Sequence, residues 1–423
     1  MPRCEYARMF TGLRSKITPV RLVVLVCAAQ VCVQVGAYVW PALLPGMMLR
    51  WSLSNSEAGW ITGVFYAAYT AAVPILVTLT DRVDAKRVYL AGVALTVVAH
   101  LSFALFADGF WTAIAARALA GIGWAGTYMT GLKLLADRVE GRLLARAVAG
   151  HAAGIGIAGA FSFMIADLVQ GAAGWQGAFA VGAGFAVCAW IVVALFAPAR
   201  QAASHAAAPS YRLFDFRPVF RNRSAMAYAL AYCFHTWEMN ALRGWGVAFL
   251  AFVAVSTGDA HPWIAPTVVV TAMGLIGTGA SIFGNEMSIR FGRMRLIRVA
   301  IAGSVLVGAV IGFLGPSSYT LAAALVLAYG FVIWLDSSSL TAGTAGSADP
   351  ARRGATLAVH SMLGYGGGFV GPLAVGWTLD LAGGMSRIGW GAAYLTIAVL
   401  VLISLVVFTA MKPRDIEGDR GRP

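Results

Sequence analysis

Charged residues are scarce in this sequence. Asp, Glu, Lys and Arg make up 12% of its 423 residues, whereas a soluble domain carries about 25%. The chain therefore has too few polar side chains to cover a water-facing surface of its size, which excludes an ordinary soluble domain. Hydrophobic residues make up 59% of the chain. Apolar runs of about 18 residues or more recur along it, and runs of that length form membrane-spanning helices. The composition predicts an all-α membrane protein with many spans.

Several motifs of metal sites and enzymes are also missing. The five cysteines form no CxxC pair, and four of them lie inside apolar runs, so we predict neither a disulfide framework nor a metal site. The chain contains no Walker A sequence, which argues against ATP as the direct energy source. It contains neither HExxH nor GxSxG, which argues against the common membrane proteases and hydrolases. We therefore expect no enzymatic activity and no cofactor.

Charged and Gly/Pro-rich breaks divide the sequence into twelve predicted transmembrane helices. They cover residues 19–47, 58–80, 88–107, 111–132, 146–169, 176–197, 224–252, 264–288, 296–315, 320–345, 354–379 and 389–411. With this division, 27 of the 31 Lys and Arg residues lie on the side that carries both termini, and only Arg50 and Arg387 lie on the other. Basic residues gather in cytoplasmic loops. We therefore expect a protein of the plasma (inner) membrane with both termini cytoplasmic. The same asymmetry accounts for the net charge of +13 without nucleic acid.

The longest internal break separates two halves of similar pattern. We predict a six-helix bundle over residues 1–197, a cytoplasmic linker over 198–223, and a second six-helix bundle with a short tail over 224–423. The second half of the linker either forms an amphipathic surface helix or is disordered. "DRVDAKR" is matched by "IRFGRMR" 208 residues later, and His151 by His360. Such offsets indicate a duplicated unit, as is common in secondary transporters.

The loop after the second span resembles a motif of the major facilitator superfamily. That motif reads Gly-x-Leu-Ala-Asp-Arg-x-Gly-Arg-Lys/Arg, and this chain keeps Asp81, Arg82 and Lys86 but departs from it at Asp84 and at two other positions, Val77 and Ala85. A second motif of the family, Arg-x-x-x-Gly-x-x-x-Ala, is matched from Arg117 onward, while the glycine run at 154–161 lacks the proline of the antiporter motif.

The resemblance implies two bundles that rock about a site at the membrane midplane. The first, fourth, seventh and tenth helices would line the cavity. The second, fifth, eighth and eleventh would form the seam between the bundles. Asp81, Arg82 and Lys86 would form the gating motif, with Arg290 and Arg293 as their counterparts in the second half.

Four charged residues lie inside the predicted spans away from their ends. They are Arg117, Glu238, Arg243 and Asp336. A charge inside the membrane is costly, so each is a candidate functional residue. The resemblance places all four on cavity-lining helices.

Glu238 is the sharpest candidate, because it shares a helix face with His235. It either binds and releases a proton or forms a structural ion pair. Arg243 lies roughly 140° around the helix from Glu238. Either a break at Gly244 brings the two side chains together, or they have separate partners.

The other two charges leave alternatives open. Arg117 could hold an anionic group of a substrate or pack against a carboxylate or backbone carbonyls. Asp336 lies beside three serines and is either a proton or cation site or part of a polar helix–helix contact.

Uncharged polar residues at helical spacing could complete the pocket. They are Gln30, Gln34 and Tyr38 on the first span and Trp124 and Tyr128 on the fourth. The alternative is that they form polar seams between helices.

These features predict a secondary active transporter that moves a small solute by alternating access. The membrane arginines favour an organic anion or zwitterion carried by proton symport. Proton-coupled efflux of drugs or metabolites is the alternative, and a transport-inactive sensor of the same fold is a more distant one. We expect a small-molecule substrate, protons and the lipid bilayer as partners, no nucleic acid, and a monomer.

Overall fold

The structure is a computed structural model that describes residues 18–80, 82–198, 216–259, 262–416 and 419. In these residues it is all-helical, as predicted. Nine helical segments of the described residues are long and apolar enough to span a membrane. One of them, α8, covers both the fifth and the sixth predicted spans, and the fourth and eleventh predicted spans are helical as well. The described helices therefore account for all twelve predicted spans.

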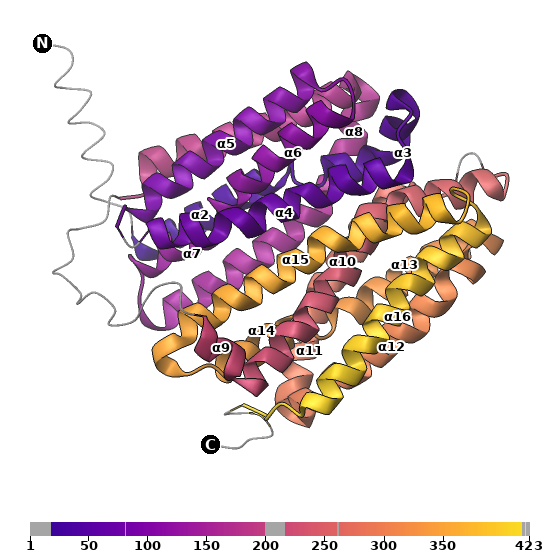
Figure 1. Cartoon of the computed structure of the whole chain (residues 1–423). Helices are drawn as coiled ribbons and strands as arrows, with labels where there is room; N and C mark the ends of the chain where they lie inside the picture. The colour runs from indigo at the N-terminus through magenta and orange to yellow at the C-terminus, as the bar shows by residue number, and fades with distance from the viewer. Residues whose placement is uncertain (1–17, 81, 199–215, 260–261, 417–418, 420–423) are drawn as a thin grey trace, which may run out of the picture.

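The two halves of the chain form two bundles that lie side by side (Figure 1). The first contains α2 (Pro19–Gln34), α3 (Val39–Trp51), α4 (Asn55–Leu79), α5 (Ala85–Phe106), α6 (Phe110–Ala125), α7 (Tyr128–Ala136) and α8 (Gly141–Phe196). The second contains α9 (Arg217–Arg221), α10 (Arg223–Ser256), α11 (Pro266–Phe291), α12 (Arg293–Leu314), α13 (Tyr319–Trp334), α14 (Ser337–Gly346), α15 (Arg353–Leu381) and α16 (Arg387–Met411).

Three predicted spans are interrupted rather than continuous. The first is divided into α2 and α3, the fourth into α6 and α7, and the tenth into α13 and α14. The seventh, by contrast, is one unbroken helix, α10. Breaks leave backbone groups without their helical partners, so each break provides polar groups at membrane depth. These are three of the four helices expected to line a cavity.

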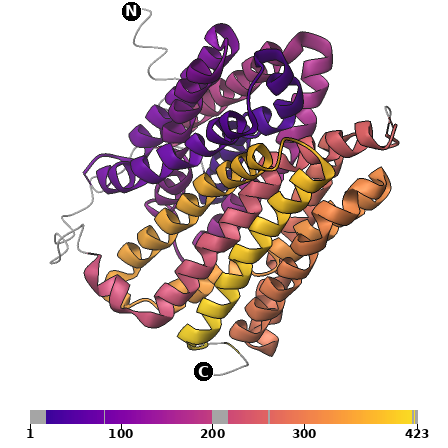
Figure 2. The same cartoon turned by 45° about the vertical axis from the view of Figure 1, so that its right-hand side comes forward.

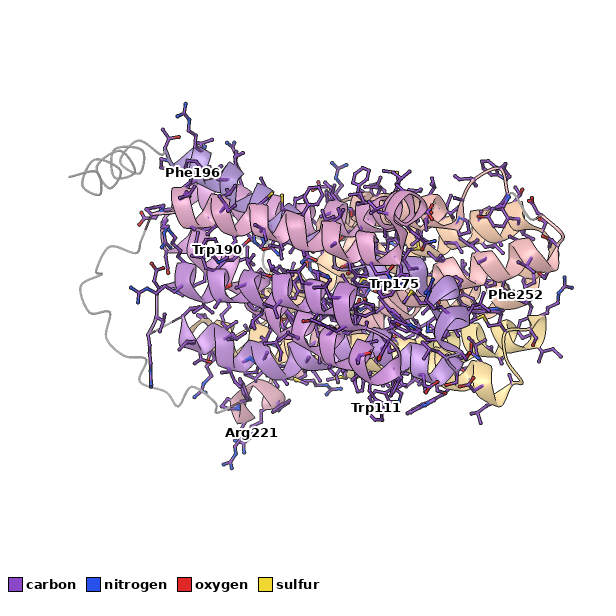
Figure 3. The ribbon with its side chains drawn as sticks, turned by 90° about the horizontal axis from the view of Figure 1, so that it is seen from above. Trp111, Trp175, Trp190, Phe196, Arg221 and Phe252 are labelled. Atoms are coloured by element: carbon purple, nitrogen blue, oxygen red, sulfur yellow. The ribbon has the colours of Figure 1, made fainter. Side chains whose placement is uncertain are left out.

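The fifth and sixth predicted spans are joined without an intervening loop. Their helix, α8, reverses at Gly174, which adopts φ +70°, a conformation that glycine allows. Ser162 and Gly182, on either side of it, both pack against the break between α2 and α3. In a straight helix they would lie about 30 Å apart. Figure 3 shows Trp175, just after the reversal, well away from Phe196 at the helix end.

Two pairs of helices form the seam between the bundles. α4 lies along α15 (Figures 1 and 2), and α8 packs against α11. Glycines permit the close approach: a Cβ at Gly59 would meet the Pro372 carbonyl oxygen at 2.8 Å, and one at Gly274 would meet the Cβ of Ala160 at 2.8 Å. The second, fifth, eighth and eleventh spans thus form the seam, as the family resemblance implied.

The two ends of the molecule allow a test of membrane orientation. Arg87, beside the first basic loop, and Asp108, in the following loop, are both exposed and lie at opposite ends of α5. We expect a cysteine at position 108 to react with a membrane-impermeant thiol reagent on intact cells. We expect a cysteine at position 87 to react only after permeabilisation. The native cysteines would first be replaced by serine. Labelling of position 87 from outside would contradict the orientation.

Candidate functional site

Arg117 anchors the break in the first span. Its side chain, 2% exposed, projects from α6 and donates hydrogen bonds to the backbone oxygens of Ala37 at 3.2 Å and Ile61 at 3.5 Å. Its guanidinium carbon lies 4.6 Å from the centre of the Phe65 ring. The carbonyl of Ala37 lies within the break. Arg117 is therefore satisfied by carbonyls and a ring face, which was one of the arrangements expected from the sequence.

Ser162 fixes the other side of the same break. Its hydroxyl donates to the Val35 carbonyl at 2.6 Å and accepts from the Tyr38 backbone N–H at 3.1 Å. The Tyr38 ring stacks on Phe163 with centroids 5.5 Å apart. These contacts hold Tyr38 in one orientation at the boundary between the bundles.

Arg243 reaches across that boundary from α10. Its Nη1 donates to the Tyr38 hydroxyl at 2.7 Å. The guanidinium carbon lies 4.7 Å from the centre of the Tyr38 ring and 5.0 Å from that of Trp334. The side chain is only partly buried. Because α10 continues through Gly244, the break considered from the sequence is absent. Arg243 and Glu238 have separate partners.

Glu238 faces the interior of the second bundle. The side chain is 3% exposed and accepts a hydrogen bond from the Tyr329 hydroxyl of α13 at 2.6 Å. Ser304 of α12 also forms a hydrogen bond to it. Both of these partners are uncharged. A carboxylate at this depth without a cation is expensive when ionised, so Glu238 is suited to hold a proton.

His235 pairs with Asp336 at the break in the tenth span. The His235 Nδ1 lies 2.9 Å from a carboxylate oxygen of Asp336, one of the two residues between α13 and α14. Tyr232 stacks on His235 at 5.6 Å and on His360 at 4.0 Å between centroids. His360 contacts the Thr344 hydroxyl at 3.1 Å. The pair therefore begins a row of polar and aromatic rings between α10, α14 and α15.

An aromatic cluster spans the boundary between the bundles. Trp124 of α6 lies 5.1 Å from Tyr69 of α4 and 5.3 Å from Tyr365 of α15, between centroids. Tyr128 stacks on Trp124 at 6.4 Å. Among the described residues, the buried Trp124 Nε1 has no hydrogen-bond partner, whereas the Tyr69 hydroxyl forms a hydrogen bond with Tyr365. Trp124 and Tyr128 were expected here. Tyr69 and Tyr365 were not singled out from the sequence, although Tyr66 and Tyr69 have helical spacing.

The two glutamines of the first span lie elsewhere. Gln30 is fully buried and accepts a hydrogen bond from the Tyr89 hydroxyl of α5 at 3.3 Å. Gln34 is 1% exposed, and its Nε2 lacks a partner among the described residues. The Gln30 contact is between two helices of the first bundle, as in the polar seam considered from the sequence.

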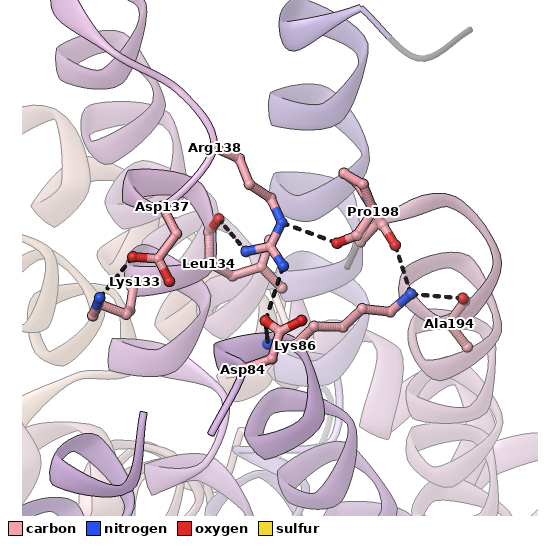
Figure 4. A network of polar contacts seen from close by, with 9 residues as sticks. Asp84, Lys86, Lys133, Leu134, Asp137, Arg138, Ala194 and Pro198 are labelled. Atoms are coloured by element: carbon pink, nitrogen blue, oxygen red, sulfur yellow. Dashed lines mark hydrogen bonds and ion pairs between the residues drawn. The ribbon is translucent and has the colours of Figure 1, made fainter. Parts of the chain in front are cut away.

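The loop of the predicted gating motif is held within the first bundle (Figure 4). Asp81 lies outside the described residues, and Arg82 is exposed. Lys86 donates to the backbone oxygens of Ala194 at 2.9 Å and Ala197 at 2.5 Å.

Asp84, where the chain departs from the family motif, contacts both the start of α5 and a residue that follows α7. It accepts from the Lys86 backbone N–H at 3.0 Å, which caps α5, and pairs with Arg138 at 2.9 Å. The loop is therefore tied to the ends of α7 and α8.

The corresponding loop of the second bundle is tied to the C-terminal tail. Arg293, 2% exposed, binds both carboxylate oxygens of Asp419, at 2.8 and 3.1 Å. It also donates to Asn285 Oδ1 at 3.0 Å and to the Ser339 carbonyl at 3.2 Å. Arg290 instead forms an exposed pair with Glu286 at 3.3 Å. Asp419 was not considered from the sequence because it follows the last apolar run.

Two six-helix bundles, interrupted helices and buried charges beside the breaks define the class of secondary transporters. Residues 26–372 match the Major Facilitator Superfamily, and the chain belongs to that family. It is accordingly a transporter and not an enzyme.

Relatives within the family have spinster names. The chain is 23% identical to protein spinster homolog 1 of Mus musculus over 271 residues, which is 62% of this chain and 51% of that protein. It is 24% identical to protein spinster homolog 3 of Danio rerio over 231 residues, 52% of this chain and 46% of that protein. The chain thus spans about half the length of these relatives.

Solved structures confirm the fold. A bacterial homolog of the human lysosomal transporter spinster, in an inward-facing and occupied conformation, gives a TM-score of 0.77 at 14% identity, covering 93% of this chain and 97% of that one. The nucleoside transporter NupG gives a TM-score of 0.74 at 14% identity, covering 93% of this chain and 100% of that one.

Proposed function

We propose that this transporter moves an organic anion or zwitterion by alternating access, coupled to protons. The proposal rests on the partners of the charged residues inside the predicted spans. Among the described residues, neither Arg117 nor Arg243 forms an ion pair with a carboxylate. Glu238 is bound by hydroxyls, and Asp336 by a histidine. Two cations thus lack an acidic partner near the boundary between the bundles.

Arg243 is the residue we assign to the anionic group of the substrate. It is partly exposed, its guanidinium is held between two ring faces, and it contacts Tyr38 of the opposite bundle. A guanidinium can bind a carboxylate or phosphate through two parallel hydrogen bonds. Substrate would replace Tyr38 as its partner, so binding would change a contact between the bundles.

The aromatic cluster would receive the rest of the substrate. Its rings come from both bundles, so the space between them changes when the bundles rock. The Trp124 Nε1, which has no partner among the described residues, is a donor at a buried site, where an unsatisfied polar group is unfavourable. A substrate with a planar or apolar part and hydrogen-bond acceptors fits these groups.

The proton would bind in the second bundle. Glu238 is the primary site, and the His235–Asp336 pair is close enough to influence it electrostatically. Both lie against α13 or its break, so movement of the tenth span would alter the surroundings of both. The proton site is thus separate from Arg243, the cation that would bind the substrate. This arrangement allows proton and substrate to be carried together, as symport requires.

The proposed cation site can be tested by substitution of Arg243. Arg243→Ala should raise the KM for an anionic substrate at least tenfold, because a charge-assisted pair contributes about 1.5–3 kcal/mol. Arg243→Lys should recover only part of the loss, since it retains charge without the paired geometry. Uptake into proteoliposomes would be measured with a panel of organic anions, zwitterions and cations.

Arg353→Ala is the matched control, because Arg353 is an exposed arginine of the same bundle and belongs to no candidate site. A cationic substrate whose uptake is unchanged or improved by Arg243→Ala would contradict the proposal. It would favour the efflux alternative.

A further inference from the structure

Asp380 binds the first turn of a helix in the opposite bundle. It lies at the end of α15 and accepts four hydrogen bonds from the start of α4. The Asn55 backbone N–H and amide donate to one oxygen, at 3.1 and 2.7 Å. The Ser56 backbone N–H and hydroxyl donate to the other, at 2.7 and 2.5 Å.

This contact completes the capping of α4. The first N–H groups of a helix have no partner within it. Ser54 satisfies the N–H of Glu57 through a capping box, whereas those of Asn55 and Ser56 are satisfied by Asp380. Two groups of the first bundle are therefore capped by a carboxylate of the second, which the positive end of the helix dipole also favours.

Asp167 makes the corresponding contact in the opposite direction. It lies on α8 in the first bundle and accepts a hydrogen bond at 2.9 Å from the Thr267 hydroxyl, in the first turn of α11 in the second. The N–H of Asn55 has no equivalent here, because α11 begins with a proline. This contact is the weaker of the two.

The two contacts are related by the internal repeat. Asp167 and Asp380 are 213 residues apart, and Ser56 and Thr267 are 211 apart, close to the offsets between the repeated motifs. In each case a carboxylate near the end of the fifth span of one repeat binds the start of the second span of the other. Both contacts lie at the end of the molecule opposite the basic loops, since α4 and α11 begin there.

We infer that Asp380 and Asp167 are positioning residues of the transport cycle, which hold the bundles together at this end and must release before it can open. Opening would separate α4 from α15 and α11 from α8, so that water must replace the aspartates as partners. The inference requires that the bundles move relative to each other. It depends on neither the identity of the substrate nor proton coupling.

The test measures opening directly with a reporter cysteine. Ala42, 5% exposed, lines a cavity of about 170 Å³ together with Val247 and Thr267 of the other bundle. In a background without native cysteines, Ala42→Cys should react slowly with a membrane-impermeant maleimide. Asp380→Asn should accelerate this reaction roughly tenfold, the factor that corresponds to about 1.4 kcal/mol.

The remaining variants should accelerate labelling by different factors, according to how much of the contact each one removes. Asp167→Asn, which affects a single bond, should accelerate labelling roughly threefold, and the double variant roughly thirtyfold if the two contacts act independently. Ser56→Ala keeps the charge and removes one donor, and should give an acceleration of roughly threefold. It tests the inference even if Asp380→Asn fails to fold.

Two controls separate opening from loss of charge or of stability. Asp108 lies in the next loop on the same side, and among the described residues its carboxylate binds only Thr112 of its own bundle, so Asp108→Asn should leave the labelling rate unchanged. A protein that retains only Cys233, which lies on α10 with its backbone against Gly367 of α15, should not react faster when Asp380 is replaced. The inference is overturned if Asp380→Asn and Ser56→Ala leave the rate within about twofold of the parent, or if the Asp108 or Cys233 controls rise equally.

Discussion

Glu238→Gln should abolish proton-driven accumulation of substrate and leave substrate exchange measurable. Glutamine preserves the shape of the side chain and can still accept from the Tyr329 hydroxyl, which lies 2.6 Å from the carboxylate. It cannot gain or lose a proton. If Glu238 couples proton movement to the conformational change, a pH gradient will no longer concentrate the substrate. Counterflow between equal concentrations, which needs no net proton movement, should continue.

The surroundings of Glu238 make this substitution informative. Among the described residues Glu238 forms no ion pair, so its neutralisation leaves no buried cation without a partner. We therefore expect Glu238→Gln to express and fold normally. Loss of an ion-paired carboxylate would instead have cost about 3–5 kcal/mol.

Tyr329→Phe is the matched control for Glu238. It removes the hydrogen bond and keeps the carboxylate, so coupling should persist with a changed pH dependence. Measurements in proteoliposomes with and without an imposed pH gradient distinguish the variants. A folded Glu238→Gln protein that still accumulates substrate in response to the gradient would exclude Glu238 as the coupling site and shift attention to Asp336.

The sequence predicted the spans because bilayer thickness and backbone hydrogen bonding restrict a membrane chain to long apolar helices. Each predicted span is helical in the structure. The charged residues could also be found from the sequence, because a charge within an apolar run is rare and costly. The positions of the spans and of the buried charges along the chain could therefore be predicted from the sequence alone.

The residues that those charges bind could not be predicted from the sequence. Helical periodicity placed His235 and Glu238 on one face, yet the first binds Asp336 and the second Tyr329, which lie about two turns apart along the tenth span. That choice depends on the break between α13 and α14, which no proline or glycine marks at 335–336. Breaks of this kind are stabilised by tertiary contacts. Ser162 and Arg117 stabilise the one in the first span.

The buried pair of Arg293 and Asp419 is another contact that the sequence did not predict. Asp419 is 1% exposed although it lies eight residues after α16 ends. The tail returns to the bundle: the Tyr228 hydroxyl donates to the Arg414 carbonyl at 2.9 Å, and Ile416 packs against Gly346. Local sequence gives no indication of this return, because a polar tail after a last helix usually remains in solvent.

Asp419→Ala should destabilise the second bundle by about 3 kcal/mol, because it leaves a buried guanidinium without its carboxylate. Among the described residues, Arg293 would retain Asn285 and the Ser339 carbonyl as partners. The matched control is Glu286→Ala, which breaks the exposed Arg290–Glu286 pair at the same end of the molecule. Exposed pairs contribute about 0–1 kcal/mol. Thermal unfolding of the purified protein in detergent, followed by a thiol-reactive dye, should therefore separate the two variants clearly.

A double variant distinguishes an ion pair from simple packing of the tail. Replacing both Arg293 and Asp419 by leucine removes the unpaired charge together with the pair, so it should recover a large part of the stability lost in Asp419→Ala. If the tail stabilised the bundle only by covering it, the double variant would be no more stable than the single one. Equal and small shifts for Asp419→Ala and Glu286→Ala would show that Arg293 is solvated, and that the tail does not hold α12 against α14.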